Sequence, residues 1–320
     1  MYRGVDKINT TIEIPRITGN ENCLESLRIA GSIHKMIRKE FQPMLKPGLD
    51  LINLSQFINR RTREYIKKYS SSKQYNDGIG FPPVPSMSNI IAHYSPHKIS
   101  KILGYDDNLK IDFGVHVNGW IVDSSSTIYF NPKYSILHTA TKEALDSALK
   151  IVGIDTPINE VSRIISEIIE SYEIMYRGNY HTLKVIDGCS GHNITQYNIH
   201  GGILVPNKPS LSNRRFTKGV YAIEPFASIL SSKCMEGPER NNYCIKKKYQ
   251  NNSNPLYKYF NSMIFTDSHL EHYNINNINR SMLDIYPALY GIDNDMSCQY
   301  EHTIYLDSNT KEIISKFDDY

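Results

Sequence analysis

The chain has 320 residues, of which 40% are hydrophobic and 22% charged, and these values exclude a wholly disordered chain, a collagen and a coiled coil. The formal net charge of +3 argues against a dedicated binder of DNA or membranes, and no apolar run approaches the roughly 18 residues of a membrane span. The five cysteines are odd in number and form no CxxC pair, which indicates free thiols, a reducing compartment and a cytoplasmic protein.

The N-terminal part is predicted to be an arm followed by two helices. Residues 1–20 are mostly polar and indicate the arm. Apolar residues at helical spacing predict one helix over residues 22–39, with Asn20 or Asn22 as its N-cap, and another over residues 49–69. The next stretch, GIGFPPVPSMSNIIAHYSPH, is too rich in proline and glycine for a helix and predicts short extended pieces and turns.

The segment LKIDFGVHVNGWIVDSSSTIYF gives the clearest structural signal, a β-hairpin whose two-residue turn is Asn118–Gly119. Counting outward from this turn places Gly114 opposite Asp123, so that Asp112 and Asp123 share one face as diagonal neighbours. Carboxylates are rare on strands and repel each other, and a divalent cation between them is the simplest remedy. Two exposed aspartates on the wet side of the hairpin are an equal alternative.

The second half of the chain repeats this order of elements. Helices are predicted over residues 136–153 and 157–171, and short strands then alternate with loops to residue 228. The order helix, helix, strands thus occurs twice, with a boundary near residues 131–133, and suggests two similar α+β halves packed face to face. Residues 238–285, rich in Asn, Lys and Tyr, predict an insertion with some helix before a final strand, CQYEHTIYLD.

Three further residues are candidate metal ligands. His192 lies in GCSGHNITQYNIHGG, where flanking glycines let a loop turn tightly and present the ring. Glu224 and Glu301 lie in the apolar runs VYAIEPF and CQYEHTIYL, within apparent strands, where an unpaired carboxylate is costly to bury. With the two aspartates they would form a carboxylate-rich site for two hard metal ions. A structural histidine, and glutamates that pair with Lys or Arg, are the alternatives.

These motifs together resemble a known family. IAHYSPH, KIDFGVHVNGWIVD, GHNITQYNIHGG, VYAIEPF and QYEHTIYL follow the order found in the type 2 methionine aminopeptidases, from about residue 20 to the C-terminus. The resemblance implies the pita-bread fold, an α+β architecture of two pseudo-symmetric halves with a central antiparallel sheet, outer helices and a helical insertion in the second half. The arm would cover residues 1–20 and a single catalytic domain residues 21–320, with the insertion at about residues 238–285.

The resemblance also implies roles for individual residues. The implied metal ligands are Asp112, Asp123, His192, Glu224 and Glu301. Asp123 and Glu301 would bridge two ions, and Glu224 would also shuttle the proton. His93 and His200 match active-site histidines that contact the substrate. The residues that would line the methionine pocket and the nearby cleft are Phe81, Ile199 and Tyr286.

The activity implied by the resemblance is removal of the initiator methionine from nascent proteins, with small second residues preferred. A hydroxide held between two divalent ions (Mn, Co, Fe or Zn) would attack the first peptide bond. The partners would be nascent polypeptide N-termini, and we expect a monomer. The charged N-terminal extension typical of eukaryotic type 2 enzymes is absent, so transient ribosome association stays open. The alternatives are a non-catalytic pita-bread protein that binds ribosomes or RNA, and an Xaa-Pro aminopeptidase of the same fold.

The sequence departs from the family pattern at the pocket. Val84 stands where a glycine is expected beside the methionine pocket, and Asn242 stands where type 2 enzymes usually place another histidine. These changes bear on substrate preference and turnover, not on metal binding. His116 shares the hairpin face with Asp112 but is expected to be structural, and Lys246–Lys248 is expected to be a solvated loop.

Overall fold

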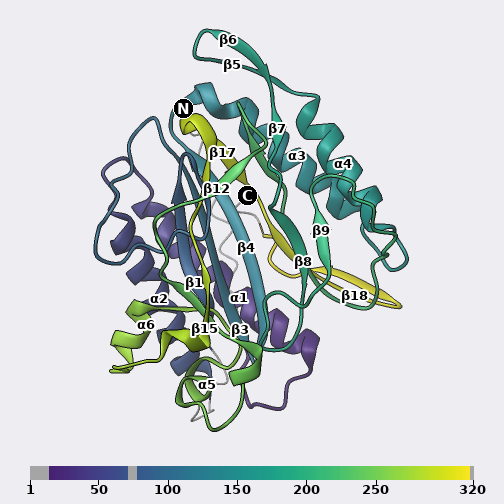
Figure 1. The fold of residues 1–320 in the computed structure, drawn as a ribbon. Helices are drawn as coiled ribbons and strands as arrows, with labels where there is room; N and C mark the ends of the chain where they lie inside the picture. The colour runs from purple at the N-terminus through teal and green to yellow at the C-terminus, as the bar shows by residue number, and fades with distance from the viewer. Residues whose placement is uncertain (1–13, 71–77, 318–320) are drawn as a thin grey trace.

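The computed structural model describes residues 14–70 and 78–317, and its two α+β halves are arranged as the sequence predicts (Figure 1). Most of the expected arm, residues 1–13, lies outside the described residues. The remainder is not a free arm, because Ile14 and Ile17 are buried in the core. The Ile17 amide donates to the Tyr69 carbonyl at 2.8 Å, which fastens this segment to the end of a helix.

The first half consists of two helices packed on an antiparallel sheet of order β1-β3-β4. Its elements are α1 (Cys23–Phe41), α2 (Leu51–Tyr69), β1 (Gly78–Met87), β2 (Ile90–Ala92), β3 (Asn108–Val117) and β4 (Trp120–Tyr129). Both helices begin at a side-chain cap, as their sequences predict. Asn22, not Asn20, caps α1 through a capping box with Glu25, and Asp50 caps α2.

Strand β1 corrects the prediction of short extended pieces, because it runs for ten residues through three prolines. Proline has no N–H to donate and is normally confined to sheet edges and bulges. Here β1 is an edge strand of its sheet, and its register with β3 shifts between Ile79 and Phe81 and again between Phe81 and Val84. These irregularities accommodate the prolines without breaking the strand.

The hairpin of β3 and β4 has the predicted register. Val117 pairs with Trp120, Gly114 with Asp123, and Asp112 with Ser125. Asn118 and Gly119 both have positive φ, as this kind of two-residue turn requires. The two aspartates therefore share a face of the hairpin.

The second half has the helices α3 (Ser135–Ile151) and α4 (Ile158–Glu170), at the right of Figure 1, and a five-stranded antiparallel sheet of order β19-β18-β10-β8-β9 in the described chain. The strands of this sheet are β8 (Ser190–Ile194), β9 (Leu204–Pro206), β10 (Gly219–Ile223), β18 (His302–Asp307) and β19 (Thr310–Ile313). Smaller antiparallel sheets join β7 (Lys184–Val185), β11 (Phe226–Ser228) and β17 (Ser297–Gln299); β2, β12 (Cys234–Glu236) and β16 (Leu289–Gly291); and β5 (Glu173–Tyr176) and β6 (Asn179–Thr182). Short 3-10 helices lie at Gln42–Met44, Pro132–Tyr134, Lys247–Tyr249, Arg280–Met282 and Ile292–Asn294.

Side-chain hydroxyls join the two halves along a seam between β4 and the strands β17 and β18. The Asp123 amide donates to Thr303 Oγ1 at 2.8 Å, and this hydroxyl donates back to the Asp123 carbonyl at 2.6 Å. Ser124 Oγ donates to the Glu301 carbonyl at 2.9 Å, and Thr127 Oγ1 to the Gln299 carbonyl at 2.5 Å. The Ser and Thr residues of DSSST thus replace the backbone ladder that a continuous sheet would have.

The predicted insertion packs around its own small core at the lower end of the molecule in Figure 1. It contains the expected helices, α5 (Pro255–Phe260) and α6 (Asp267–His272), and in addition an antiparallel sheet of β13 (Asn242–Ile245), β14 (Phe265–Thr266) and β15 (Leu283–Tyr286). The core of the segment consists of Tyr243, Ile245, Leu256, Phe260, Phe265, Leu270 and Leu283. Within the described ranges, no helix is long and apolar enough to cross a membrane.

Candidate metal centre

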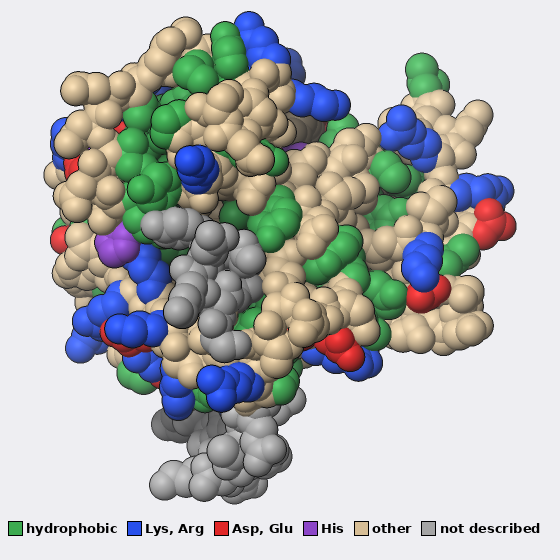
Figure 2. All heavy atoms as spheres, turned by 90° about the horizontal axis from the view of Figure 1, so that it is seen from below, with side chains coloured by type: hydrophobic (Ala, Val, Ile, Leu, Met, Phe, Trp, Pro, Cys, Tyr) green, Lys and Arg blue, Asp and Glu red, His purple; other side chains and the backbone are tan. Residues whose placement is uncertain are grey.

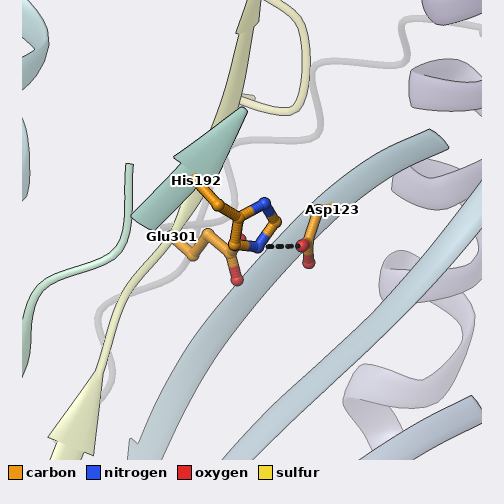
Figure 3. A group of neighbouring side chains, drawn as sticks. All are labelled: Asp123, His192 and Glu301. Atoms are coloured by element: carbon orange, nitrogen blue, oxygen red, sulfur yellow. Dashed lines mark ion pairs between the residues drawn. The ribbon is translucent and has the colours of Figure 1, made fainter. Parts of the chain in front are cut away.

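The fold brings the five predicted ligand residues to one place from both halves. Asp112 and Asp123 come from the hairpin of the first half, and His192, Glu224 and Glu301 from the second. Ligand atoms of Asp123, His192 and Glu301 all lie within 4.8 Å of one another (Figure 3). His192 Nε2 lies 3.6 Å from Asp123 Oδ2 and 3.3 Å from Glu224 Oε1.

The structure corrects the setting of His192, which lies in the middle of strand β8 and not in a glycine-rich loop. Its backbone pairs with Ala222 on one side and with Leu204 on the other. The preceding glycine serves close packing, because a Cβ on Gly191 would collide with the Ala222 carbonyl oxygen. A central strand fixes the direction of the imidazole more firmly than a loop would.

Glu224 and Glu301 lie at two matched breaks in the strands, not within strands as the sequence suggested. Glu224 follows β10 and precedes β11, whereas Glu301 follows β17 and precedes β18. Strands β10 and β18 pair on one side of the breaks, and β11 and β17 on the other. Because a break lets the backbone leave the pleat, both carboxylates turn inward while the flanking residues stay paired.

Gln299 is a member of the site that sequence analysis missed. Its Nε2 lies 3.3 Å from Asp112 Oδ2, 3.3 Å from Glu224 Oε2 and 3.4 Å from Glu301 Oε2, as donor to each. It is 1% exposed, so water does not compete for these contacts. Its place two residues before Glu301 in QYE was a usable signal, because period-two alternation puts both side chains on one face of an extended segment.

The electrostatics of the cluster call for a cation. Burial raises the pKa of Asp112 to about 6, and burial followed by mutual repulsion raises the pKa of Asp123, Glu224 and Glu301 well above the usual carboxyl range. The pKa of His192 is lowered to about 3, first by burial and then by His200, so the ring is neutral and able to act as a ligand.

Buried atoms without partners mark where such a cation would fit. Oδ1 of Asp112 and Oδ1 of Asp123 are buried and have no hydrogen-bond partner in the protein. Buried polar atoms are otherwise almost always paired, so these two oxygens are available to a ligand. Carboxylate oxygens with one imidazole form a donor set suited to divalent Mn, Fe, Co or Zn. The residues present therefore fit a metal.

A cavity of about 270 Å³ opens directly onto the cluster. Asp112, Asp123, His192 and Glu224 contribute to its lining. The predicted substrate-side residues that also line it are Phe81, His93, Ile199, His200 and Tyr286. The ring of His200 lies 4.6 Å from the His192 ring, centroid to centroid, and the rings of His93 and His200 each lie 5.8 Å from that of Tyr286. The cavity thus has a charged end and a wall of apolar and aromatic groups.

His93 is held in an unusual backbone conformation by Asn242. His93 has φ of +60°, in the left-handed region that non-glycine residues seldom adopt. Asn242 is 3% exposed, and its Nδ2 donates to the His93 carbonyl at 2.7 Å while its Oδ1 accepts from Ser95 Oγ at 2.8 Å. Backbone strain of this kind concentrates at functional sites. Asn242 is therefore a support for His93 as well as a residue of the cavity wall.

Two other sequence observations have a structural explanation. His116 is buried away from the cluster, where its Nδ1 accepts from the Gly119 amide at 3.2 Å and closes the hairpin turn. Val84 lines the cavity, and its Cα lies opposite that of Asp112 in the β1–β3 ladder. His116 is thus structural, and the departure at Val84 lies directly beside the candidate metal centre.

Comparisons with known proteins agree with this geometry. Residues 25–308 match the model of metallopeptidase family M24. Methionine aminopeptidase 2 of Komagataella phaffii is 33% identical over 344 residues, covering 100% of this chain and 76% of that protein, and methionine aminopeptidase 2 of Encephalitozoon hellem is 32% identical over 340 residues, covering 99% and 93%. The crystal structure of a methionine aminopeptidase from Thermotoga maritima superposes with a TM-score of 0.63 at 19% identity, covering 95% of this chain and 100% of that one.

Proposed function

The chain belongs to metallopeptidase family M24, within its methionine aminopeptidase 2 group, and we propose that it removes the initiator methionine from newly made proteins. The observation that carries this proposal is the cluster of four buried carboxylates and one imidazole at the end of an apolar cavity. The cluster supplies a charged reaction centre, and the cavity supplies a place for one apolar side chain. Small second residues are preferred, as the resemblance implies.

The cofactor is a pair of divalent ions held by Asp112, Asp123, His192, Glu224 and Glu301. Four carboxylates carry a charge of about −4 when ionised, which two divalent ions would balance. Such ions, when bound, lower the pKa of a water molecule and polarise the scissile carbonyl. Which metal occupies the site in the cell depends on its availability, because this donor set accepts several.

The protein's own residues carry out the proton transfers and the positioning. Glu224 takes a proton from the attacking water and passes it to the departing amine. His93 and His200 have pKa values lowered by burial, that of His200 to about 4, so at neutral pH they are uncharged N–H donors. A neutral donor beside the carbonyl oxygen stabilises the charge that develops there in the transition state. Phe81, Ile199 and Tyr286 enclose the methionine side chain.

The setting of the protein follows from the same reading. We assign a single catalytic domain over residues 21–320, with the insertion at about residues 238–285, acting as a monomer on nascent N-termini. All five cysteines lie in the described ranges and are free thiols, which supports a reducing, cytoplasmic location. Contact with ribosomes would be transient.

The test is release of free methionine from Met-Ala-Ser and Met-Leu-Ser peptides, with an Xaa-Pro peptide as a third substrate. Chelator-stripped protein should be inactive, and Mn or Co should restore cleavage of Met-Ala-Ser in preference to the other two. Asp123→Asn should lose this activity and bound metal together. The exposed Asp106 offers a matched control, and Asp106→Asn should behave as the wild type.

Other outcomes would reject parts of the proposal. Preferred cleavage of the Xaa-Pro peptide would assign the other aminopeptidase of this fold. Metal content near zero together with no hydrolysis would leave a binding protein on an inherited fold.

A further inference from the structure

A second cavity, of about 490 Å³, lies between α2 of the first half and α6 of the insertion. It shares no lining residue with the cavity at the metal centre. The residues that line it are Met44, Asn53, Gln56, Phe57, Asn59, Arg60, Arg63, Ser268 and His272. The described lining thus contains amides, guanidinium groups, a hydroxyl and an imidazole, and no carboxylate. Figure 2 shows basic side chains and a histidine close together on the lower face of the molecule.

The spacing of these residues makes the groove a feature of both helices. Asn53, Gln56, Arg60 and Arg63 follow intervals of three, four and three residues, which place them along one stripe of α2. Ser268 and His272 are four residues apart on α6 and therefore lie on one face of that helix. The two polar faces meet in the groove.

Arg63 is a half-buried cation without a carboxylate partner in the described part of the chain. The two carboxylates near this end of α2, Glu40 and Glu64, both pair with Arg61. Arg60 is 3.9 Å from Glu64 through its Nε. Arg63 has only the Tyr273 hydroxyl as a side-chain acceptor, and its Nε is buried and donates to no atom.

The carboxylates of α6 do not neutralise Arg63 either. Asp267 pairs with Arg280 at 2.7 Å, and Glu271 pairs with His97 at 3.0 Å. The pKa of His272 is lowered by burial and by Arg63, so this ring is neutral at pH 7 and adds hydrogen-bonding atoms without charge. The positive charge of the groove therefore comes from its arginines.

An anion is the missing partner. Arginine stays protonated in proteins, so burial cannot neutralise Arg63 by proton loss. An uncompensated buried charge is unfavourable, and an anion in the groove relieves it. The planar guanidinium binds phosphate oxygens through two parallel hydrogen bonds, and the surrounding amides and hydroxyl can donate to the remaining oxygens. We propose that this groove, here called the anion groove, binds a phosphate group, either as free phosphate or as the phosphomonoester of a small nucleotide.

Occupation of the anion groove would link two parts of the molecule. Arg63 belongs to the first half, whereas Ser268 and His272 belong to the insertion, which also contributes Tyr286 and Asn242 to the active-site cavity. Bound phosphate would thus hold the insertion against the first half. The site is independent of the peptidase activity proposed above.

The experiment measures binding of inorganic phosphate, and separately of AMP, to the full chain by isothermal calorimetry and by thermal unfolding at constant ionic strength. Arg63→Met should weaken binding of both at least tenfold, a loss typical of a charged hydrogen-bonding partner. Without phosphate, Arg63→Met should be no less stable than the wild type, because it removes an uncompensated charge. The exposed Arg163, which pairs with Glu167 on α4, gives the matched control Arg163→Met, and its binding should be unchanged.

Ser268→Asp is the second variant, because it places a carboxylate in the anion groove without removing Arg63. It should abolish phosphate binding and raise the unfolding temperature measured without phosphate. Equal affinities for phosphate and AMP would assign the free ion, and tighter AMP binding would assign a nucleotide. Unchanged binding in Arg63→Met and Ser268→Asp, or binding that disappears when the metal is stripped, would overturn the proposal.

Discussion

Gln299 connects carboxylates that repel one another. One amide nitrogen faces oxygens of Asp112, Glu224 and Glu301 at 3.3 to 3.4 Å. An N–H donor at this point offsets part of the repulsion and fixes the orientation of the three groups before a metal arrives. Groups that orient metal ligands in this way affect affinity even though they do not touch the ion.

Replacing Gln299 by leucine should therefore weaken metal binding. We expect a loss of about 10- to 100-fold in affinity for Mn, because the carboxylates lose their common donor. Calorimetric titration of chelator-stripped protein measures this directly. The exposed Gln196 provides the control, and Gln196→Leu should bind as the wild type does. Equal affinity in Gln299→Leu and wild type would show that the carboxylates orient without the amide.

Asn242 offers a separate test, of catalysis without a change in metal binding. In Asn242→Asp the donor to the His93 carbonyl is replaced by a carboxylate, which repels that carbonyl and should displace the His93 ring. We expect kcat/KM for Met-Ala-Ser to fall about tenfold, the effect of slightly misplacing one active-site group. Metal content should be unchanged. Steady-state kinetics and elemental analysis together decide this, and unchanged kinetics would contradict the support role.

Side-chain parity explains what could be predicted at the residue scale. Asp112 and Asp123 were placed on one face because the two-residue turn fixes the register of a hairpin. His192 was wrongly placed in a loop, because glycine was taken as a turn signal where it serves a close approach between strands. Gln299 was missed because an amide gives no charge signal of its own.

At the scale of elements, the hairpin depends on a neutral histidine. The pKa of His116 is lowered to about 3 by burial, and its Nδ1 accepts from the Gly119 amide in the turn. The unfolded chain binds a proton at this ring near pH 6.5, whereas the folded protein does not. Because the folded pKa is the lower one, the contribution of His116 to stability is present above pH 6.5 and declines as the pH falls.

Replacing His116 by asparagine should remove this acid sensitivity. Between pH 6.5 and 5 the wild type should lose about 2 kcal/mol more of its free energy of unfolding than His116→Asn does. Urea unfolding at the two pH values measures the difference. The half-buried His181, in β6, provides a control substitution, His181→Asn. Parallel pH dependence in wild type and His116→Asn would mean that the buried ring is not the cause.

Element boundaries followed from local signals, and breaks inside strands did not. The caps at Asn22 and Asp50 were readable because a side chain there bonds to the first turn of its own helix. Strand β1 was divided into pieces because its prolines are compatible with a strand only through pairing irregularities with β3. The breaks at Glu224 and Glu301 depend on pairing between distant strands, which no local pattern reveals.

At the scale of the whole molecule, the candidate metal centre lies where the two halves meet. Asp112 and Asp123 belong to one half and the remaining three ligands to the other, next to the seam at Thr303. An ion bound by both halves would add a second connection to the seam. Metal binding should therefore stabilise the fold as a whole, because a ligand that binds only the folded state shifts the unfolding equilibrium.

Removal of metal should lower the unfolding temperature. At a free metal concentration 100-fold above Kd, each ion should contribute about 3 kcal/mol, so chelation should lower Tm by at least about 5 °C. Differential scanning calorimetry of stripped and reloaded protein measures the shift. Asp123→Asn should show little response to either treatment, whereas Asp106→Asn should respond fully. A stripped wild type with unchanged Tm would exclude a role for metal in holding the halves together.

The seam has a consequence for how the enzyme is made. The hairpin that carries Asp112 and Asp123 is complete early in synthesis, but Glu301 and the hydroxyl of Thr303 are added near the end. A growing chain that stops short of Glu301 has an exposed hairpin and an incomplete ligand set. Such a chain cannot hydrolyse the N-termini of its neighbours, or its own. Peptidase activity is therefore withheld until the two halves close on each other, with no separate propeptide required for the delay.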